Sequence, residues 1–114
     1  MTTIYKICGR PAWEEAQTAG LFAGSPADQS DGFIHFSTAA QLAGTAAKHF
    51  AGLSGLMLLA VDGATLGAAL RWEPSRGGEL FPHLYAALSL SAVLWTCPLA
   101  DEVGGRRAFP ELVS

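Results

Sequence analysis

The sequence predicts one α+β domain that spans residues 1–114 and is built on a mainly antiparallel sheet. Two stretches with helical spacing and helix-capping residues lie in the first half of the chain. Several short apolar runs, separated by Gly, Pro and Ser, lie mostly behind them, and no linker divides the chain. A chain of this length buries roughly two thirds of its unfolded surface in a single core.

Composition narrows the class of protein. Half of the residues are hydrophobic and 15% are charged, which excludes a disordered, highly solvated chain. The formal net charge of -3 argues against general binding to nucleic-acid backbones. The net charge still allows a local basic patch, formed by Arg71, Arg76, Arg106 and Arg107. Separately, the apolar composition allows a surface through which the protein forms a homodimer.

Three further features concern location and cysteine chemistry. The N-terminus lacks the charged-then-apolar pattern of a signal peptide, from which we expect a cytoplasmic protein. The uncharged run at residues 80–100 contains Pro82 and Pro98, so we interpret it as buried strands and expect no membrane span. Cys8 and Cys97 form no CxxC pair, and we expect them to pack as small apolar groups; a disulfide between them is the less favoured alternative.

The chain begins with a strand and a helix. The apolar run from Ile4 to Cys8 predicts a strand in which Ile4 and Lys6 share a face. Pro11 suits the first turn of a helix that continues to about Ala19, and Gly20 follows where a left-handed residue is favoured. Residues 21–32 are rich in Gly, Ser, Pro and Asp, so we expect a loop that can move over a binding site.

A second strand and helix follow. The stretch Asp31-Gly32-Phe33-Ile34-His35-Phe36-Ser37-Thr38 predicts a strand that stops at Ser37, with Phe33, His35 and Ser37 on one face. Thr38 and Gln41 have the spacing of a capping box, so we expect a helix over residues 39–50. We interpret His49, near the end of this helix, as a cation against the helix dipole or a surface residue, outside any site.

The rest of the chain predicts further strands. Leu56 to Val61 is an apolar run expected to be covered on both faces. Strands at residues 66–73 and 80–88 are expected to form a hairpin around the turn at residues 74–79. One more strand is expected at residues 92–99, and residues 106–114 are expected to form an edge strand or a packed tail.

Two of the predicted strands carry polar groups on otherwise apolar faces. An imidazole or hydroxyl that is buried without a partner costs about 1–3 kcal/mol, so His35 and Ser37 must be either paired in the core or used by a site. Phe81, His83 and Tyr85 share a face of a later strand, where they form either an aromatic core or a surface that stacks a flat ring.

Glu73 has two possible roles, and the common active-site motifs are missing from the sequence. Glu73 is either a solvated carboxylate paired with Arg71 or Arg76, or a group at the lip of a pocket. The sequence contains no GxGxxG, P-loop or GxSxG motif, and Ser37 has no third group to complete a nucleophilic triad. No short ligand spacing supports a metal site, so we expect none.

Taken together, the motifs resemble a known family. The chain carries, in order, Ile4-Tyr5-Lys6-Ile7, Trp13-Glu14-x-Ala16, Gly20, Asp31-Gly32-Phe33-Ile34-His35-Phe36-Ser37, Trp72-Glu73 and Phe81-Pro82-His83-Leu84-Tyr85. Their order and spacing resemble the small bacterial proteins of domain of unknown function family 952 over nearly the whole chain. That family looks like a compact branch of the ADP-ribosyltransferase fold. Its second-strand motif is similar to the His-x-Ser segment of NAD-dependent RNA 2′-phosphotransferases.

The resemblance implies a split antiparallel sheet with a cleft for NAD or a related nucleotide. It implies that the cofactor-binding residues are His35, Ser37 and Thr38 on the cleft wall, His83 and Tyr85 near the nicotinamide or adenine, and Lys6 or Arg10 at the pyrophosphate. Family members commonly have histidine where this chain has Lys6. The lysine therefore either contacts a phosphate in its place or leaves the site impaired.

Three functions follow as expectations. The first is a transferase or hydrolase that acts at the N-glycosidic bond of NAD, with Glu73 near the ribose and His35 as the catalytic residues, because a carboxylate stabilises the oxocarbenium-like transition state. The second is a non-catalytic module that binds NAD, ADP-ribose or another nucleotide. The third is a structural protein that forms a homodimer through its apolar surface.

Overall fold

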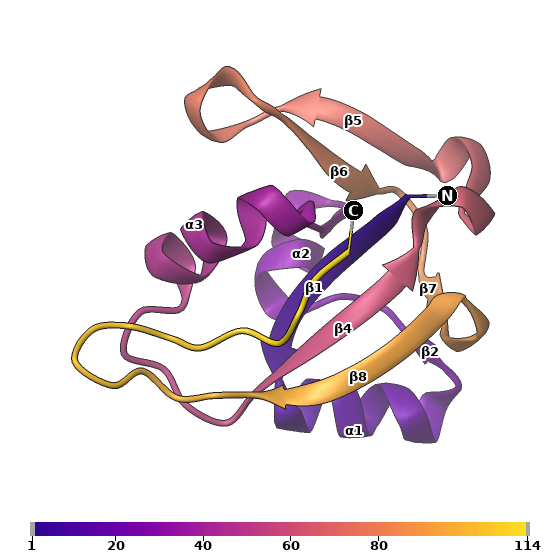
Figure 1. Ribbon diagram of the computed structural model, residues 1–114. Helices are drawn as coiled ribbons and strands as arrows, with labels where there is room; N and C mark the ends of the chain where they lie inside the picture. The colour runs from indigo at the N-terminus through magenta and orange to yellow at the C-terminus, as the bar shows by residue number, and fades with distance from the viewer. Residues whose placement is uncertain (1, 114) are drawn as a thin grey trace.

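The computed structural model describes residues 2–113 and confirms an α+β fold with antiparallel sheets (Figure 1). The largest sheet has the order β1-β4-β8, and the second has the order β3-β6-β5. A short third sheet pairs β2 with β7. The strands are β1 (Thr3–Gly9), β2 (Leu21–Phe22), β3 (Ile34–His35), β4 (Leu56–Asp62), β5 (Leu70–Pro74), β6 (Leu80–Leu84), β7 (Leu88–Ser89) and β8 (Val93–Leu99).

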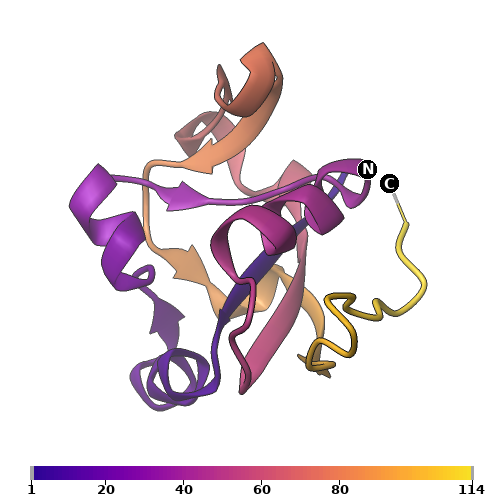
Figure 2. The ribbon, with the colours of Figure 1, turned by 90° about the vertical axis from the view of Figure 1, so that its left-hand side faces the viewer.

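Three α-helices and four short 3₁₀ turns complete the described chain. The helices are α1 (Arg10–Ala19), α2 (Pro26–Asp31) and α3 (Ala39–His49), and the turns are η1 (Gly63–Thr65), η2 (Gly67–Ala69), η3 (Arg76–Gly78) and η4 (Leu90–Ala92). Figures 1 and 2 show the β5–β6 hairpin standing apart from the β1–β4–β8 sheet as a separate layer. The sheet is therefore split, and the gap between its parts bears on the site described below.

The β1–β4–β8 sheet has an apolar core on each face. Ile4 and Cys8 pack with Trp13 of α1 on one face, whereas Tyr5 and Leu42 of α3 pack on the other. The central strand β4 is buried over residues 56–61, as its uninterrupted apolar run predicted. The two helices thus cover opposite faces of this sheet, and residues of β1 contact both sides.

Helices α1 and α3 confirm the predictions made from local signals. Pro11 lies in the first turn of α1, and Gly20 ends that helix with φ 86°, in the left-handed region that favours glycine. Thr38 caps α3: its side chain accepts a hydrogen bond from the Gln41 backbone, and the Gln41 side chain accepts one from the Thr38 backbone.

The predicted loop at residues 21–32 is wrong. The segment instead contains β2 and the six-residue helix α2. Ser25 caps α2, Asp28 completes its capping box, and Pro26 occupies the first turn. Asp28 is buried, so α2 is held by its caps and by one polar side chain, without an apolar stripe.

The strand predicted before Thr38 is shorter than expected and joins two sheets. Only Ile34 and His35 pair with β6. Beyond them, Phe36 N–H donates to the Pro82 carbonyl, and Ser37 forms a two-residue antiparallel bridge with Tyr5 of β1. This segment therefore crosses from the second sheet to the first within four residues.

The later strands differ from prediction mainly at their ends. The turns η1 and η2 delay the start of β5 to Leu70, and the predicted strand over residues 80–88 is divided into β6 and β7. The described part of the C-terminal segment is a packed tail: Phe109 and Leu112 pack on the α3 side of the sheet. The buried Tyr5 hydroxyl donates to the Val113 carbonyl and accepts from the Val113 N–H. Ser114 lies outside the described residues.

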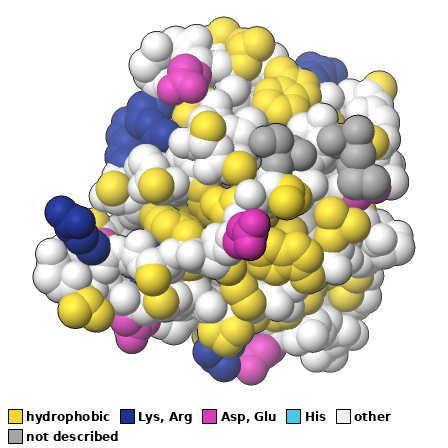
Figure 3. All heavy atoms as spheres, viewed as in Figure 1, with side chains coloured by type: hydrophobic (Ala, Val, Ile, Leu, Met, Phe, Trp, Pro, Cys, Tyr) yellow, Lys and Arg dark blue, Asp and Glu magenta, His cyan; other side chains and the backbone are white. Residues whose placement is uncertain are grey.

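The uncharged run at residues 80–100, expected to form two buried strands, forms the three strands β6, β7 and β8; β6 is buried over residues 81–84, whereas Leu99 is the one buried residue of β8. None of the helices within residues 2–113 has the length and apolar character needed to cross a membrane. Cys8 and Cys97 are free thiols, and Cys8 is buried. Apolar side chains gather over the sheet in the view of Figure 3. Separately, Leu94 of the edge strand β8 is exposed.

Candidate functional site

A cavity of about 590 Å³ opens between the two larger sheets. Its walls come from β1, β3 and β6, from the start and end of α2, from α3 and from the β5–β6 turn. Its polar lining residues include Lys6, Asp28, Asp31, His35, Ser37, Thr45, Lys48, His49, Arg76 and His83. The cavity lies where the segment from Ile34 to Ser37 crosses between sheets.

The two predicted histidine faces meet at this cavity. His35 of β3 and His83 of β6 are directly opposite each other in the antiparallel ladder, with ring centroids 5.6 Å apart. Phe33 packs against both rings, at 4.6 Å from His35 and 4.2 Å from His83. Ser37 also lines the cavity and is buried. His35, His83 and Ser37 therefore form one wall of the cavity, and Phe33 packs against the two imidazole rings.

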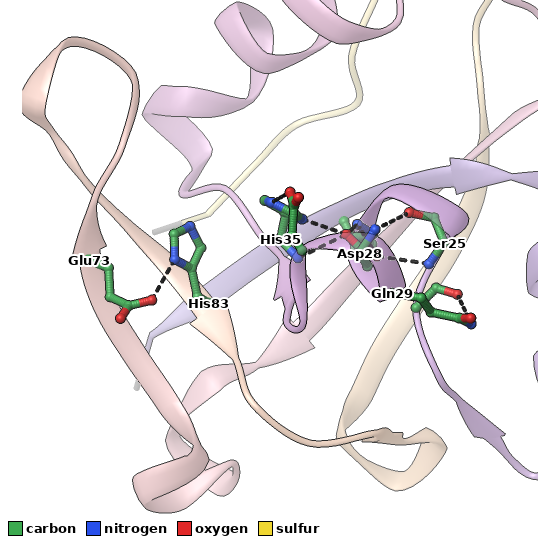
Figure 4. Close-up of polar contacts among 9 residues, drawn as sticks. Ser25, Asp28, Gln29, His35, Glu73 and His83 are labelled. Atoms are coloured by element: carbon green, nitrogen blue, oxygen red, sulfur yellow. Dashed lines mark hydrogen bonds and ion pairs between the residues drawn. The ribbon is translucent and has the colours of Figure 1, made fainter.

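Asp28 anchors this wall from α2 (Figure 4). Its carboxylate lies 2.6 Å from His35 Nδ1 and 2.7 Å from Lys6 Nζ. It also accepts hydrogen bonds from the backbone N–H groups of Ser25 and His35. Asp28 and Lys6 are only 2% and 5% exposed. A buried carboxylate with this many donors is held in one position, and it holds the imidazole of His35 in turn.

Burial and pairing act differently on the two charges. Burial alone raises the pKa of Asp28, but the hydrogen bond from His35 and the charge of Lys6 outweigh it and hold that pKa well below its usual range. Burial lowers the pKa of Lys6, although the charge of Asp28 opposes the shift. Burial also raises the pKa of the neighbouring Cys8 to about 11, so this thiol stays protonated at neutral pH.

A second carboxylate holds His83. Glu73 Oε1 lies 2.8 Å from His83 Nδ1 and accepts a 2.7 Å hydrogen bond from the Tyr85 hydroxyl. The hydrogen bonds from Tyr85 and His83 lower the pKa of Glu73, and the bond to Glu73 raises the pKa of Tyr85. Figure 4 shows Glu73 on the side of His83 that faces away from His35. Each histidine is thus held through Nδ1 by its own carboxylate.

The other end of the cavity carries cations. Arg76, in the β5–β6 turn, lies over the ring of Phe81 at 4.9 Å and donates a long hydrogen bond of 3.4 Å to Thr45 of α3. Thr45 bonds in turn to the Ser37 hydroxyl at 2.8 Å. Lys48 and His49 from the last turn of α3 complete this end.

His49 is affected by its neighbours. Burial lowers its pKa, and the charges of Lys48, Arg76 and His35 lower it further. Lys48 and Arg76, two cations from two separate elements, therefore act on the same imidazole and disfavour a further positive charge there. Such a site attracts an anionic group.

The predicted site residues fall into two groups. His35, Ser37, His83 and Lys6 line the cavity. The other four lie outside its lining: Glu73 and Tyr85 stand behind His83, Thr38 caps α3, and Arg10 is exposed at the start of α1. The binding roles of these residues stay predictions.

The alternatives for the charged residues are resolved by contacts. Within residues 2–113, Glu73 forms no ion pair with Arg71 or Arg76, since its partners are His83 and Tyr85. Arg71 lies over the Tyr85 ring at 4.8 Å. Arg107 donates to the backbone carbonyls of residues 50, 53 and 100, far along the chain from the cavity residue Arg76, so the predicted basic residues serve separate contacts.

Several polar cavity residues were not among the predicted site residues, including Asp28, Asp31, Thr45, Lys48, His49 and Arg76. Asp28 had a signal, because Ser25 and Asp28 have capping-box spacing around Pro26. His49 was assigned to the surface; it is exposed, but it also faces the cavity. Lys48 and Arg76 had no local signal, since their approach depends on how the β5–β6 turn meets α3. Within residues 2–113, no group of three His, Cys, Asp or Glu side chains is placed to share a metal ion.

Comparisons with known proteins identify close relatives. The family model described as "Protein of unknown function (DUF952)" matches residues 7–96. The X-ray crystal structure of protein CC0527 from Caulobacter crescentus has 47% identity and a TM-score of 0.90, and the match covers 94% of each chain. The solution NMR structure of CC0527 has 48% identity and a TM-score of 0.81, and covers 92% of this chain and 90% of that one. No curated protein matches the sequence.

Proposed function

Since this chain belongs to the DUF952 family of proteins of unknown function, we propose its function from the site itself: the cavity between the sheets binds a nucleotide with phosphate groups, such as NAD or ADP-ribose. The observation that carries the proposal is the distribution of charge in the cavity. Arg76 and Lys48 line the cavity beside no buried acid of their own, whereas the buried acid Asp28 is already paired with Lys6 and His35.

The size of the cavity supports this class of ligand. Its volume of about 590 Å³ lies within the range of about 300–1,000 Å³ that is typical of small-molecule and cofactor sites. The cationic end suits phosphates, because guanidinium groups bind phosphate oxygens through paired hydrogen bonds. The hydroxyls of Ser37 and Thr45 and the imidazoles of His35 and His83 suit the ribose and the base. The resemblance to the ADP-ribosyltransferase fold favours the same ligands.

Direct titration tests the proposal. Isothermal titration with NAD, ADP-ribose and AMP is expected to show saturable binding, and Arg76→Gln is expected to weaken it by at least about tenfold, because a hydrogen bond to a charged group contributes about 1.5–3 kcal/mol. The matched control is Arg106→Gln, which removes the same charge from an exposed position outside the cavity lining. Absence of binding by all three nucleotides, or equal loss in the two variants, would refute the proposal.

A second candidate is cleavage of the N-glycosidic bond of NAD. It is favoured by His83, whose Nδ1 is held by Glu73, and by Asp31, an exposed carboxylate that lines the cavity. Developing positive charge on a ribose is stabilised by a carboxylate beside it. In this scheme Asp31 faces the ribose and Glu73 acts through His83, as a positioning residue.

Nicotinamide release separates turnover from binding. Purified protein is incubated with NAD, with and without RNA or cell extract, and released nicotinamide is measured. Cleavage predicts release that is reduced by at least tenfold in His35→Ala, Glu73→Ala and Asp31→Asn, on the scale of general acid–base effects of about 10²–10⁴. If the protein binds NAD and releases no nicotinamide, it is a non-catalytic binding module. Nicotinamide release that is unchanged in all three variants would refute the enzymatic function.

A further inference from the structure

We propose that the carboxylate of Asp31 occupies an anion site of this protein, on His35 Nε2, and that a phosphate group displaces it when ligand binds. Asp31 Oδ2 lies 2.9 Å from His35 Nε2 in the structure. The inference rests on the proposed function, because it names the part of the nucleotide that the cavity recognises and the side chain that precedes it there.

The first step concerns the hydrogen bonds of His35. Both ring nitrogens face carboxylate oxygens, Nδ1 at 2.6 Å from Asp28 and Nε2 at 2.9 Å from Asp31. The Nδ1 contact is a hydrogen bond to a buried carboxylate, whereas the Nε2 contact is an ion pair with an exposed one. The Nδ1 side of the ring is therefore fixed in the protein, and the Nε2 side meets a group that an anion from solution can replace.

The second step concerns the difference between its two partners. Asp28 is 2% exposed and has four polar contacts. They come from Lys6 Nζ, from the backbone N–H of Ser25, and from the backbone N–H and ring Nδ1 of His35. Asp31 is 55% exposed, and within residues 2–113 its carboxylate contacts His35 alone. It is the last residue of α2, just before Gly32 at φ 86°. Asp31 is thus free to rotate into solvent, whereas Asp28 is not.

The third step concerns what replaces Asp31. Lys48 and His49 of α3 and Arg76 of the β5–β6 turn line the same cavity as His35. The charges of Lys48, Arg76 and His35 all lower the pKa of His49. The Asp31 carboxylate contacts His35 among these groups, whereas a phosphate offers three oxygens and carries more negative charge. The arrangement therefore suits a phosphate group better than the acid that stands there.

Pyrophosphate is the probe that isolates this site, since it carries the charge of a nucleotide without its base or ribose. At low ionic strength we expect Asp31→Asn to bind inorganic pyrophosphate about 1.5- to 5-fold more tightly than wild type, because an exposed ion pair of about 0.2–1 kcal/mol no longer competes. The matched control is Glu14→Gln, which removes the same charge from the exposed side chain of a residue on α1, outside the cavity lining, and leaves Kd nearly unchanged. His35→Gln is expected to weaken binding by at least about tenfold.

Nuclear magnetic resonance provides a readout that a change in folding does not imitate. In ¹⁵N-labelled wild-type protein, the Nε2 resonance of His35 is expected to move on titration with pyrophosphate. The inference is overturned if neither wild type nor Asp31→Asn binds pyrophosphate, if Asp31→Asn and Glu14→Gln change Kd equally, or if the His35 Nε2 resonance stays still at saturation.

The outcomes also separate this inference from the proposed function. Tighter pyrophosphate binding by Asp31→Asn, without binding of NAD, ADP-ribose or AMP, upholds the anion site and refutes the nucleotide proposal. Nucleotide binding that leaves the His35 Nε2 resonance unchanged, with Asp31→Asn no tighter than wild type, refutes the anion site and upholds the nucleotide proposal.

Discussion

Replacement of Asp28 by asparagine is expected to be among the most damaging isosteric changes in this protein. The substitution keeps the shape of the side chain and one acceptor oxygen, which still serves a backbone N–H of Ser25 or His35. It removes the negative charge that Lys6 Nζ meets at 2.7 Å, and Lys6 is 5% exposed. A buried ammonium then remains without its counter-ion.

The magnitude follows from the contacts that are lost. Two charge-assisted hydrogen bonds, from Lys6 and from His35 Nδ1, contribute about 1.5–3 kcal/mol each, and loss of one partner from a buried ion pair costs about 3–5 kcal/mol. We expect Asp28→Asn to lower the free energy of unfolding by about 3–5 kcal/mol. For 114 residues the unfolding entropy is about 0.24 kcal/mol/K, which converts this loss to a fall in Tm of about 12–20 °C.

Urea and thermal unfolding measure the effect, and a double-mutant cycle assigns it to the pair. The combined variant Lys6→Met with Asp28→Asn is expected to lose at least about 1.5 kcal/mol less than the sum of the single variants, because each single change leaves a charge without its partner. The control is Asp31→Asn, three residues along the same helix and 55% exposed, which is expected to cost about 1 kcal/mol or less. A cost below about 1 kcal/mol for Asp28→Asn, or additive single variants, would refute the reasoning.

Three further predictions concern acid, backbone and the second carboxylate. Because the pKa of Asp28 is lower in the folded protein than in the unfolded chain, its contribution to stability is complete above about pH 5 and is lost progressively as the pH falls toward the lowered folded pKa. The difference in urea midpoint between wild type and Asp28→Asn should therefore shrink steadily below about pH 5, and a constant gap would contradict this origin of acid sensitivity. Gly24→Ala should cost about 1–3 kcal/mol more than Gly20→Ala, since both positions have positive φ but only a Cβ at Gly24 meets another atom closely, Asp28 Cβ at 2.8 Å; equal Tm values for the two variants would argue against that close contact. Glu73→Gln should lower the pKa of Tyr85 in a spectrophotometric titration, because the hydrogen bond to Glu73 raises it in the wild type, and an unchanged midpoint would show that the bond is absent in solution.

Local signals predicted the elements that depend on local chemistry. The capping box of Thr38 and Gln41 and the glycine after α1 mark real helix ends because both act within one turn of the chain. The capping box of Ser25 and Asp28 is of the same kind, yet α2 was missed. Six residues with one buried side chain leave no apolar periodicity, and the rich Gly, Ser and Asp content indicated a loop instead.

The sequence predicted which strand faces carry the histidines of the site, but it did not predict the contacts between these strands and α2. Alternation placed His35 and His83 each on a polar strand face, but that they lie opposite each other depends on the register between β3 and β6, which a single sequence does not specify. Lys6 was expected either to contact a phosphate or to leave the site impaired, and its pairing with Asp28, 22 residues away in a segment expected to be a loop, was not predicted. Long-range pairing of buried charges leaves no trace in local spacing.

The bond between Tyr5 and Val113 has a consequence for folding during synthesis. The two residues are 108 positions apart, so at about 5–20 residues per second the ribosome completes Val113 about 5–20 s after Tyr5. Throughout that interval the Tyr5 hydroxyl, which is fully buried in the finished fold, has no such partner, and β1 also waits for β4. The first strand of the domain is thus among the first segments to be synthesised, yet it lacks its β4 partner until Asp62 is made and its tyrosine hydroxyl bond until Val113 is made.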